Sequence, residues 1–371
     1  SMTAHGINPN IHTIARICNP DYTDQVYKMQ KTFALSLTVN PEKQAAIEIE
    51  RLLKFPGFLK RDSFAKGRVE IVELRVDERS RLCNVALSEM NRVIKCRVLV
   101  CAVLRRGDVV APDGSFVLRE GDRIFVTAST ESLATLLDNL GIITKKVNHV
   151  MICGGGRVSY YLAQQLEKDG ITVRLIEKDP KHCEELAALL PKTEIINDDA
   201  SNTFVLKREN LESCDALVTA TGMDELNMII SLYGTKHGVS QVITKLGHME
   251  NGSMIDQLPI GSTIWPKDLC CNGIVRYIRA MHNQTGAAVS VHSIADGKAE
   301  AIEFHVEEKK PYCDKPLKNM KVKQNILVAC ITHGGVTELP GGDSVIREGD
   351  TVVVVTTRND IIYKLDDIFE A

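Results

Sequence analysis

The chain has 371 residues, of which 44% are hydrophobic and 25% charged, and its formal net charge is -3. This length exceeds what one hydrophobic core usually supports, so the sequence predicts two or more domains. The small negative charge gives no reason to expect a general affinity for nucleic acid. No apolar run approaches the roughly 20 residues of a membrane-spanning helix, so any membrane role is expected to come through a partner.

The cysteines number eleven and are scattered along the chain. An odd, scattered set favours buried, reduced thiols in a cytoplasmic protein over a disulfide framework. Cys101, Cys153 and Cys330 lie inside apolar runs that are typical of strands. Cys270 and Cys271 are adjacent on a predicted helix and point to different faces, so a metal pair is not expected there.

The first elements in chain order are two strand-length apolar segments, Ile11–Ile17 and Phe33–Val39, followed by a helical pattern from Pro41 to Leu53. A small module of about Gly67 to Leu140 comes next. It contains the stretch "VLREGDRIFVTAST", which begins at Val117 and has a glycine turn before a strand-like run.

The same order of segments returns in the second half of the chain, which predicts an internal repeat. The turn stretch reappears as "VIREGDTVVVVTTR" from Val345. "RVLVCAVLRRGDVVAPDG" from Arg97 matches "NILVACITHGGVTELPGG" from Asn325 at the same offset, and the helical pattern at Pro41 resembles one at Pro266. Several matches in register predict two copies of one unit.

The central part of the chain alternates strand-length apolar runs with helical patterns, which predicts a doubly wound parallel sheet with helices on both faces. Helices are predicted at Arg157–Lys168 and Pro180–Leu190, and another from Pro266 to about Met281. The predicted strands are Val150–Cys153, Thr172–Ile176, Glu194–Ile196, Ala216–Thr219, Gln241–Thr244 and Thr263–Trp265.

The last module, Ala287–Ala371, is mostly strand-like, with turns at "HGG", "PGGD" and "REGD" and a short helix predicted near Ile361–Ile368. This pattern predicts a small α+β domain.

The stretch "HVMICGGGRVSYYLAQQLEKDGITVRLIEKD" is typical of a nucleotide-binding strand, turn and helix. Gly154 permits the tight turn, and Gly156 lets the backbone approach a diphosphate, whose charge the following helix favours. Ser159 stands where a third glycine is usual. Glu177 ends the next strand and can bind both ribose hydroxyls while repelling a 2′-phosphate, which favours NAD over NADP. The alternative is a vestigial site.

Ligands of such sheets lie across the carboxyl ends of the strands, so residues that follow other strands are further candidates. Asp199 follows the third strand, Thr219 and Thr221 the fourth, and Lys245 the fifth. Asp198 can instead cap the next helix, and a strand-end lysine can simply be exposed.

A dehydrogenase normally carries a second domain with a proton-transfer group and an anion clamp. Here the companion is a small module, present twice, without a recognisable catalytic motif. His333 lies at a turn where the first copy has Arg105 or Arg106, and His248 and His292 are isolated, as exposed or capping histidines are. The sequence therefore favours an effector site over a hydride-transfer enzyme.

The chain resembles the TrkA family of Trk potassium-uptake regulatory proteins, whose RCK domains regulate potassium conductance. The stretches that carry the resemblance are "GGGRVS", "LIEKDP", "DDAS", "ATGMDELNM" and the repeated "REGD" turn. The resemblance covers nearly the whole chain. It implies an α/β fold, a Rossmann-type doubly wound parallel sheet with two small α+β RCK C-terminal domains.

On this basis we expect four segments: 1–58, the end of a first Rossmann-type RCK N-terminal domain; 59–142, the first RCK C-terminal domain; 143–284, the second Rossmann-type, nucleotide-binding domain; and 285–371, the second RCK C-terminal domain. The first copy's glycine loop would lie before Ser1. We therefore expect the chain to begin inside its first nucleotide-binding domain, with Ser1 and Met2 left by cloning.

The resemblance also implies roles for single residues. Gly154, Gly156 and Arg157 would line the phosphates, Glu177 would hold the ribose, and Asp199 and Ala200 would lie near adenine. Thr219 and Thr221 match the loop that faces the ribose and phosphates. Lys245 stands at a strand end where the family commonly has an arginine, and Arg16 is the corresponding basic residue in the first copy. Ser159 and Asp198 replace the usual glycines.

The complete set of predicted nucleotide-binding residues is Gly154, Gly155, Gly156, Arg157, Val158, Glu177, Lys178, Asp199, Ala200, Thr219, Ala220, Thr221 and Lys245. No catalytic and no metal-ligating residue is predicted.

The resemblance implies a cytoplasmic, nucleotide-sensing gating subunit, held at the inner face of the cell membrane by a Trk-type membrane potassium-transporter subunit. It implies a homo-oligomer, a dimer or a tetramer in a gating ring, with NAD or NADH as effector and ATP or ADP as possible competitors. The alternatives are an NAD-dependent oxidoreductase and a nucleotide-binding regulator of another cation transporter or antiporter.

Overall fold

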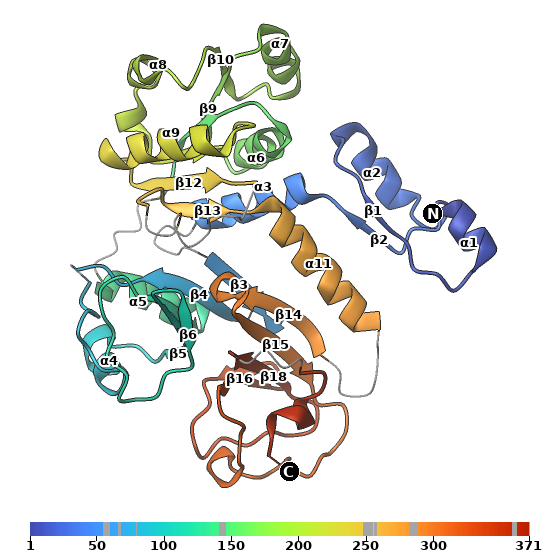
Figure 1. The fold of residues 1–371 in the computed structure, drawn as a ribbon, viewed down its shortest axis with the longest axis vertical. Coiled ribbons are helices and arrows are strands. Elements are labelled where there is room, and N and C mark those ends of the chain that lie inside the picture. Colours follow the sequence, from blue (N-terminus) through green and yellow to red (C-terminus); the bar gives the residue numbers. More distant parts are fainter. Residues whose placement is uncertain are drawn as a thin grey trace. The chain divides into compact units, whose positions relative to one another are not determined.

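The computed structural model describes residues 1–54, 60–65, 68–78, 80–140, 146–247, 255, 258–281, 288–357 and 362–370. Two compact units are formed, each from two separate stretches of chain: Ser1–Pro56 with Lys145–Ile274, and Gly57–Thr144 with Val275–Ala371 (Figure 1). Each unit is described by itself. Within the described ranges, no helix is long and apolar enough to cross a membrane.

The first unit contains a six-stranded sheet in which all neighbouring strands are parallel. The spatial order is β10-β9-β8-β11-β12-β13, so the chain reverses its direction of growth between β8 and β11. This order is that of a Rossmann-type sheet, which confirms the predicted fold class. The strands are β8 (His149–Cys153), β9 (Thr172–Glu177), β10 (Glu194–Asn197), β11 (Ala216–Thr219), β12 (Gln241–Lys245) and β13 (Ser262–Ile264).

Helices cover both faces of this sheet because successive strand residues point to opposite sides. Val150 and Ile152 of β8 pack in one core with α6 and α7, whereas Met151 and Cys153 pack in another with α8 and α9. The helices of this unit are α6 (Arg157–Lys168), α7 (Pro180–Leu189), α8 (Thr203–Arg208) and α9 (Asp224–Lys236), with a 3₁₀ turn η2 (Leu211–Ser213); α11 (Pro266–Met281) follows the last strand.

The helix α3 (Pro41–Lys54) also belongs to the core of this sheet, although it lies far from it in sequence. Its residues Ala45, Ile49 and Leu52 are buried in the same cluster as the apolar face of α6. Gln241 Nε2 at the start of β12 donates to Leu52 O at 2.6 Å. The first half of the repeat therefore contributes a helix to the nucleotide-type domain of the second half.

Before α3 the chain forms α1 (Met2–Ile7), β1 (Ile14–Arg16), α2 (Pro20–Lys28) and β2 (Leu37–Val39). The two strands pair in parallel, as β12 and β13 do, which agrees with the predicted repeat. Ile11 and Ile14 are 41% and 39% exposed. Within the described chain, β1 pairs only with β2.

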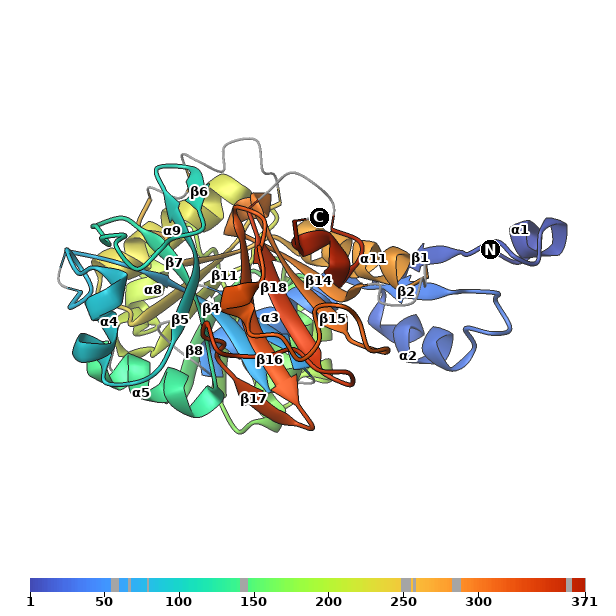
Figure 2. The same ribbon diagram turned by 90° about the horizontal axis from the view of Figure 1, so that it is seen from below.

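The second unit contains two five-stranded antiparallel sheets with the same order, β3-β4-β7-β5-β6 and β14-β15-β18-β16-β17. Figure 2 shows strands of both sheets, with those of the second sheet in orange and red. Their elements are β3 (Lys60–Phe64), β4 (Val69–Arg75), α4 (Leu87–Ile94), β5 (Leu99–Arg105), β6 (Asp108–Val110), β7 (Arg123–Ala128) and α5 (Thr130–Leu140), then β14 (Ala288–Ile294), η3 (Ala295–Gly297), β15 (Ala299–His305), η4 (Leu317–Asn319), β16 (Ile326–His333), β17 (Val336–Glu338), β18 (Thr351–Thr356) and η5 (Leu365–Ile368). The identical strand order confirms the repeat.

The two sheets share one core within this unit. Phe125 of β7 and Cys101 of β5 pack in the same cluster as Val353 of β18 and Cys330 of β16. The ring of Phe64 lies 4.5 Å from that of His292. His292 is therefore a packed, half-buried residue, and its interpretation as an exposed or capping histidine is wrong; His248 lies outside the described residues.

The end of the chain forms a 3₁₀ helix at Leu365–Ile368, where the sequence predicts a short helix; the predicted start of that helix, at residue 361, lies outside the described residues. The four segments predicted from the sequence, 1–58, 59–142, 143–284 and 285–371, stay a prediction.

Candidate functional site

Gly154 follows β8 directly and turns the chain into α6. Its φ of 98° lies in the left-handed region that favours glycine. A side-chain carbon there would lie 2.8 Å from Thr221 Cα and 2.9 Å from Thr221 N, so the backbone after β11 excludes a side chain as well. The predicted tight turn is present, and it joins the two strand ends between which the sheet reverses its direction of growth.

Gly155 is wedged between the end of β9 and α7. A side-chain carbon there would lie 2.7 Å from Leu186 Cδ1 and 3.0 Å from Glu177 Oε2. The Gly155 N–H donates to Glu177 Oε2 at 2.7 Å, and the Asp179 N–H donates to Glu177 Oε1 at 2.9 Å. Each carboxylate oxygen of Glu177 thus accepts one backbone hydrogen bond and keeps a second lone pair for a hydroxyl of a ligand.

The first turn of α6 has no side-chain cap. Its N-cap residue is Gly156, and a side-chain carbon on Gly156 would have only Ala220 O near it among the described atoms, 3.9 Å away. Arg157 is exposed beside this opening, whereas Val158 is buried. Free N–H groups and the positive end of the helix dipole favour an anion at this position.

Ser159 occupies the third glycine position, three residues after Gly156, in the first turn of α6. Its side chain is 1% exposed, and Oγ has no hydrogen-bond partner among the described residues. A side chain of this size is accommodated, but the unsatisfied hydroxyl costs about 1 to 3 kcal/mol.

Thr221 is held in place by Asn227 of α9 and by Lys245 at the end of β12. The Thr221 N–H and Oγ1 donate to Asn227 Oδ1 at 2.9 and 2.7 Å, and Lys245 Nζ donates to Thr221 O at 2.6 Å. Burial lowers the pKa of Lys245, against the charges of Asp224 and Glu42. The structure therefore brings Thr221 and Lys245 together beside the glycine loop, around a fully buried asparagine that the sequence analysis missed.

The Thr219 side chain points away from this opening. Its Oγ1 lies 2.9 Å from Ser231 Oγ of α9, which also accepts from Thr244 Oγ1 at 2.6 Å, and all three residues are buried. Thr219 is fully buried and pairs with both neighbouring strands, so it presents no accessible group to a ligand. Ala220 is also buried, and its N–H donates to Cys153 O at 2.9 Å.

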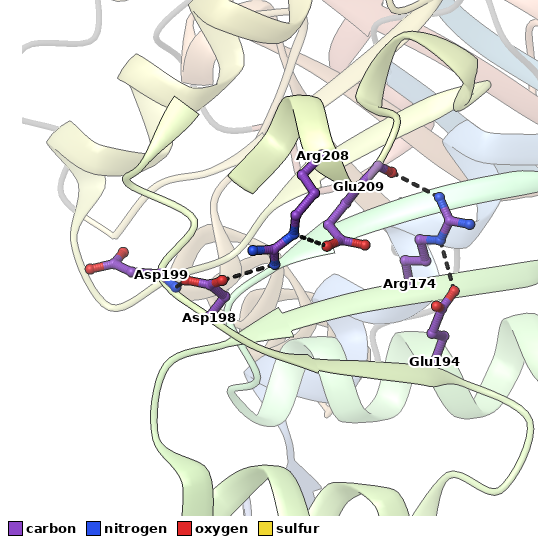
Figure 3. A network of polar contacts seen from close by, with 6 residues as sticks. All are labelled: Arg174, Glu194, Asp198, Asp199, Arg208 and Glu209. Atoms are coloured by element: carbon purple, nitrogen blue, oxygen red, sulfur yellow. Dashed lines mark hydrogen bonds and ion pairs between the residues drawn. The ribbon is translucent and has the colours of Figure 1, made fainter. Parts of the chain in front are cut away.

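Asp198 and Asp199 follow β10 and point in different directions (Figure 3). Asp198 accepts from Asp199 N–H at 2.8 Å and from Arg208 Nη2 at 2.9 Å, which lowers its pKa. The Asp199 carboxylate points away from Arg208 and accepts from Ser201 N–H at 2.9 Å. The N-cap of α8 is Asn202, so the capping role considered for Asp198 is wrong.

Arg208 and Arg174 connect this loop to the sheet through Glu209 (Figure 3). Arg208 Nε donates to Glu209 Oε1 at 2.8 Å, and Arg174 donates to Glu209 O at 2.8 Å and to Glu194 at 2.7 Å. Asp198 does not have a left-handed backbone, so its position does not require the glycine that is usual in the family. Its side chain instead fixes α8 against the end of β10.

The two remaining predicted residues differ in exposure. Lys178 is exposed after β9, and its charge adds to the hydrogen bonds from Ser201 that lower the pKa of Asp199. Ala200 is 7% exposed and packs in the core beneath α8 and α9. Lys178 and Asp199 therefore flank the ends of β9 and β10 as charged, accessible groups.

His182, in the first turn of α7, contacts the glycine loop and was also missed. Its Nε2 lies 2.9 Å from Gly155 O, and its Nδ1 lies 3.1 Å from Glu185 Oε2. Partial burial lowers the pKa of His182, but the hydrogen bonds to Glu185 and Gly155 and the charge of Glu177 outweigh it, so the pKa is raised. A histidine two residues after Pro180 carries no sequence signal, because its partner is a backbone carbonyl.

All eleven cysteines are free thiols, and Cys270 is buried while Cys271 is exposed, as their adjacency on α11 predicts. In the ranges that the structure describes, no group of histidine, cysteine and acidic residues is arranged to hold a metal ion.

Taken together, these groups provide an uncapped helix end for a phosphate or diphosphate, with a carboxylate at the neighbouring strand end for a pair of hydroxyls. The open space at Gly156 lies at the positive end of the α6 dipole, which favours an anion, and the spare lone pairs of Glu177 can accept hydrogen bonds from hydroxyl groups. The fold is that of a Rossmann-type domain combined with two small antiparallel domains.

Family models match most of this architecture. The TrkA-N domain matches residues 150–266, and the TrkA-C domain matches residues 71–141 and 301–369. The chain belongs to the TrkA family, with one TrkA-N domain between two TrkA-C domains. The TrkA-N range spans the strands β8 to β13 of the parallel sheet, and the two TrkA-C ranges cover most of each antiparallel sheet but not its first strand, β3 or β14.

Two relatives illustrate the family. The Trk system potassium uptake protein TrkA homolog 1 of Methanosarcina mazei is 27% identical, over 92% of this chain and 75% of its own length. The Trk system potassium uptake protein TrkA of Haemophilus influenzae is also 27% identical, over 96% of this chain and 78% of its own length.

Solved structures share the fold at lower identity. A crystal structure of the GsuK RCK domain matches with a TM-score of 0.54 at 14% identity, over 93% of this chain and 72% of that chain. The GsuK channel bound to NAD matches with a TM-score of 0.52 at 14% identity, over 93% of this chain and 60% of that one.

Proposed function

We propose that this protein is a nucleotide-sensing regulatory subunit of a Trk-type potassium transporter, and that NAD or NADH is its effector, with ATP or ADP as possible competitors. The observation that carries the proposal is the uncapped N-terminus of α6 beside Glu177, in a chain that belongs to the TrkA family. The names of its relatives and the NAD bound to the GsuK channel support it.

The chain's own groups divide the work of binding. N–H groups of α6 and the Gly156 amide would hold phosphates, Glu177 would accept ribose hydroxyls, and Asp199 and Ala200 would lie near the base. The residues around Thr221, which follow β11, would contact the phosphates, and the hydrogen bond from Lys245 would hold them in place. The remaining predicted residues, Gly154, Gly155, Arg157, Val158, Lys178, Thr219 and Ala220, would shape or flank this opening.

We propose that the nucleotide acts as an effector, not as a substrate. A ligand that binds more tightly to one arrangement of the subunits would increase the population of that arrangement. We expect the subunits to form a homo-oligomer, either a dimer or a tetramer in a gating ring. This oligomer would pass the shift in population to the membrane subunit. The protein would work in the cytoplasm, at the inner face of the membrane through its partner.

Isothermal titration calorimetry with NAD, NADH, ATP and ADP tests the effector site, and copurification with a Trk-type membrane subunit tests the partner. We expect saturable binding of at least one of these nucleotides. We also expect that bound NADH persists when small carbonyl compounds are added. Steady loss of NADH absorbance with any of these compounds would favour an oxidoreductase and contradict the effector role.

A further inference from the structure

The middle residue of the glycine loop is held from two sides by ionisable side chains. The Gly155 N–H donates to Glu177 Oε2 at 2.7 Å, and the Gly155 carbonyl oxygen lies 2.9 Å from His182 Nε2. Leu186, one helical turn after His182 on the same face of α7, closes the space where a side chain on Gly155 would lie. The start of α7 therefore contacts the loop directly.

The contact from His182 orients the next amide. The peptide between Gly155 and Gly156 is trans, so its C=O and N–H groups point in opposite directions. Because the Gly155 oxygen is directed to His182 on α7, the Gly156 N–H is directed away from α7. Gly156 is exposed at the uncapped end of α6, so this N–H is available to an anion.

Only the doubly protonated ring satisfies both contacts of His182. The Gly155 carbonyl and the Glu185 carboxylate are both acceptors, so Nε2 and Nδ1 must each carry a proton. A neutral imidazole has a single N–H. The charged carboxylate is the stronger acceptor, so the neutral ring would keep the contact with Glu185 and release the Gly155 carbonyl.

We propose that His182 is a positioning residue of the nucleotide site, whose protonated ring holds the glycine loop in its anion-binding conformation, so that nucleotide affinity falls as pH rises. This inference rests on the proposed function. His182 itself does not touch the nucleotide.

The sign follows from the groups that face the ring, which are Glu185 on α7 and Glu177 on β9, together with the Gly155 carbonyl. Burial opposes protonation, but these partners raise the pKa of His182 above the value of about 6.5 in an unfolded chain. The contact is therefore present at low pH and is lost as pH rises through the pKa of the folded state. The positive charge of the ring disappears with it.

Calorimetric titration of the full chain with NAD tests the inference, because the diphosphate of NAD does not titrate near neutral pH. We expect the wild-type protein to bind NAD about fivefold to tenfold more weakly at about pH 8.5 than at about pH 6. His182→Gln can still donate to the Gly155 carbonyl but carries no titrating charge, so its affinity should vary little with pH. His182→Ala should bind weakly at both values.

His237→Gln is the matched control. His237 also pairs with a carboxylate, Glu212, at 3.0 Å, but it follows the C-terminus of α9, away from the glycine loop. This variant should keep the wild-type affinity and its slope with pH. Nuclear magnetic resonance of the ligand-free protein adds a direct readout: the Gly156 amide signal should shift together with the titration of the His182 ring.

Three outcomes would overturn the inference alone. The first is a wild-type NAD affinity that does not change with pH, and the second is a His182→Ala variant with the wild-type affinity and the wild-type dependence on pH. The third is a Gly156 amide signal that does not shift when the His182 ring titrates. A wild-type protein that binds no NAD at either pH would instead contradict the proposed function, and this inference with it.

Discussion

Gly154 and Gly156 lack side chains for different reasons. Gly154 has a φ of 98° and lies against the Thr221 backbone, whereas Gly156 has a φ of -65° and open space beside it. We expect Gly154→Ala to lower the free energy of unfolding by about 2 to 4 kcal/mol, and Gly156→Ala to change it by less than about 1 kcal/mol. Urea denaturation of both variants measures this difference, and equal losses would contradict the assigned strain.

Glu177 supports the glycine loop and is a predicted ligand of the ribose, so its removal should weaken the binding of all nucleotides alike. We expect Glu177→Ala to reduce the binding free energy of NADH and of ATP by about 2 to 4 kcal/mol, because two ribose hydrogen bonds to a charged acceptor are lost. Glu194→Ala, on the neighbouring strand, is the control, since this carboxylate pairs with Arg174 instead. Unchanged affinity in calorimetry would remove Glu177 from the site.

Ser159 carries a buried hydroxyl without a partner in the described chain, inside a helix. Ser159→Ala removes this unsatisfied group and has a higher helix propensity, so we expect it to raise the free energy of unfolding by about 1 kcal/mol and leave NAD affinity unchanged. Thermal unfolding and calorimetry provide the two readouts. A loss of affinity would show instead that the hydroxyl serves the ligand.

The sequence predicted that most candidate residues follow strand ends, which are visible as the limits of apolar runs, and the structure has these strand ends; that the residues bind a nucleotide stays a prediction. It could not separate Thr221, which lies beside the loop, from Thr219, whose hydroxyl is buried with Ser231, since the direction of a side chain depends on packing with α9. His182 and Asn227 were missed because they bind backbone groups, which any residue supplies.

Among the elements, the repeated "REGD" turn shows how two copies of one structure diverge. Asp122 Oδ2 accepts the Arg119 N–H at 2.7 Å and Asp122 pairs with Arg105; at the equivalent place, Asp350 pairs with His333 at 2.8 Å. The sequence left open whether Arg105 or Arg106 corresponds to His333, and the structure identifies Arg105. Both aspartates are buried, at 1% and 3% exposed.

Loss of these carboxylates should have unequal costs, because Asp122 accepts two hydrogen bonds from the Arg105 guanidinium, whereas Asp350 accepts one from the His333 ring. We expect Asp122→Ala to lower the free energy of unfolding by about 3 to 5 kcal/mol and Asp350→Ala by about 1 to 3 kcal/mol. Chemical denaturation, with exposed Asp108→Ala as control, measures both. A larger cost for Asp350→Ala would refute the reasoning.

The elements of the parallel sheet were predicted almost to the residue, since each buried strand is a short apolar run between turn residues. The sequence did not predict that α3 packs in the core of that sheet. Its amphipathic pattern shows that one face is buried, but the pattern does not show which element covers that face. The structure answers this with Ile49 and Leu52 beside the face of α6.

At the scale of the whole molecule, the paired strands β1 and β2 leave apolar groups in water. Ile11 and Ile14 are exposed, and β1 pairs only with β2 in the described chain. Such an edge favours pairing with another polypeptide segment, so we expect the chain to be at least a dimer that buries more than about 1,000 Å².

Light scattering on the chain, and on a variant that lacks the residues before Pro41, measures the assembly. We expect the deletion to reduce the oligomer. A stable monomer in both cases would sink the expectation that this edge is covered by a second copy.

The position of α3 in the core also bears on how the protein is made. Its apolar face is complete once Lys54 has been synthesised, but it packs in the same cluster as Ile264 of β13, more than half the chain later. At about 5 to 20 residues per second, a ribosome needs on the order of 10 to 40 s to cover that interval. For about the first half of this interval, until α6 is complete at Lys168, the helix has no native surface to cover it. The first unit therefore completes its core only late in translation, and α3 is a natural target for a chaperone until α6 has been made.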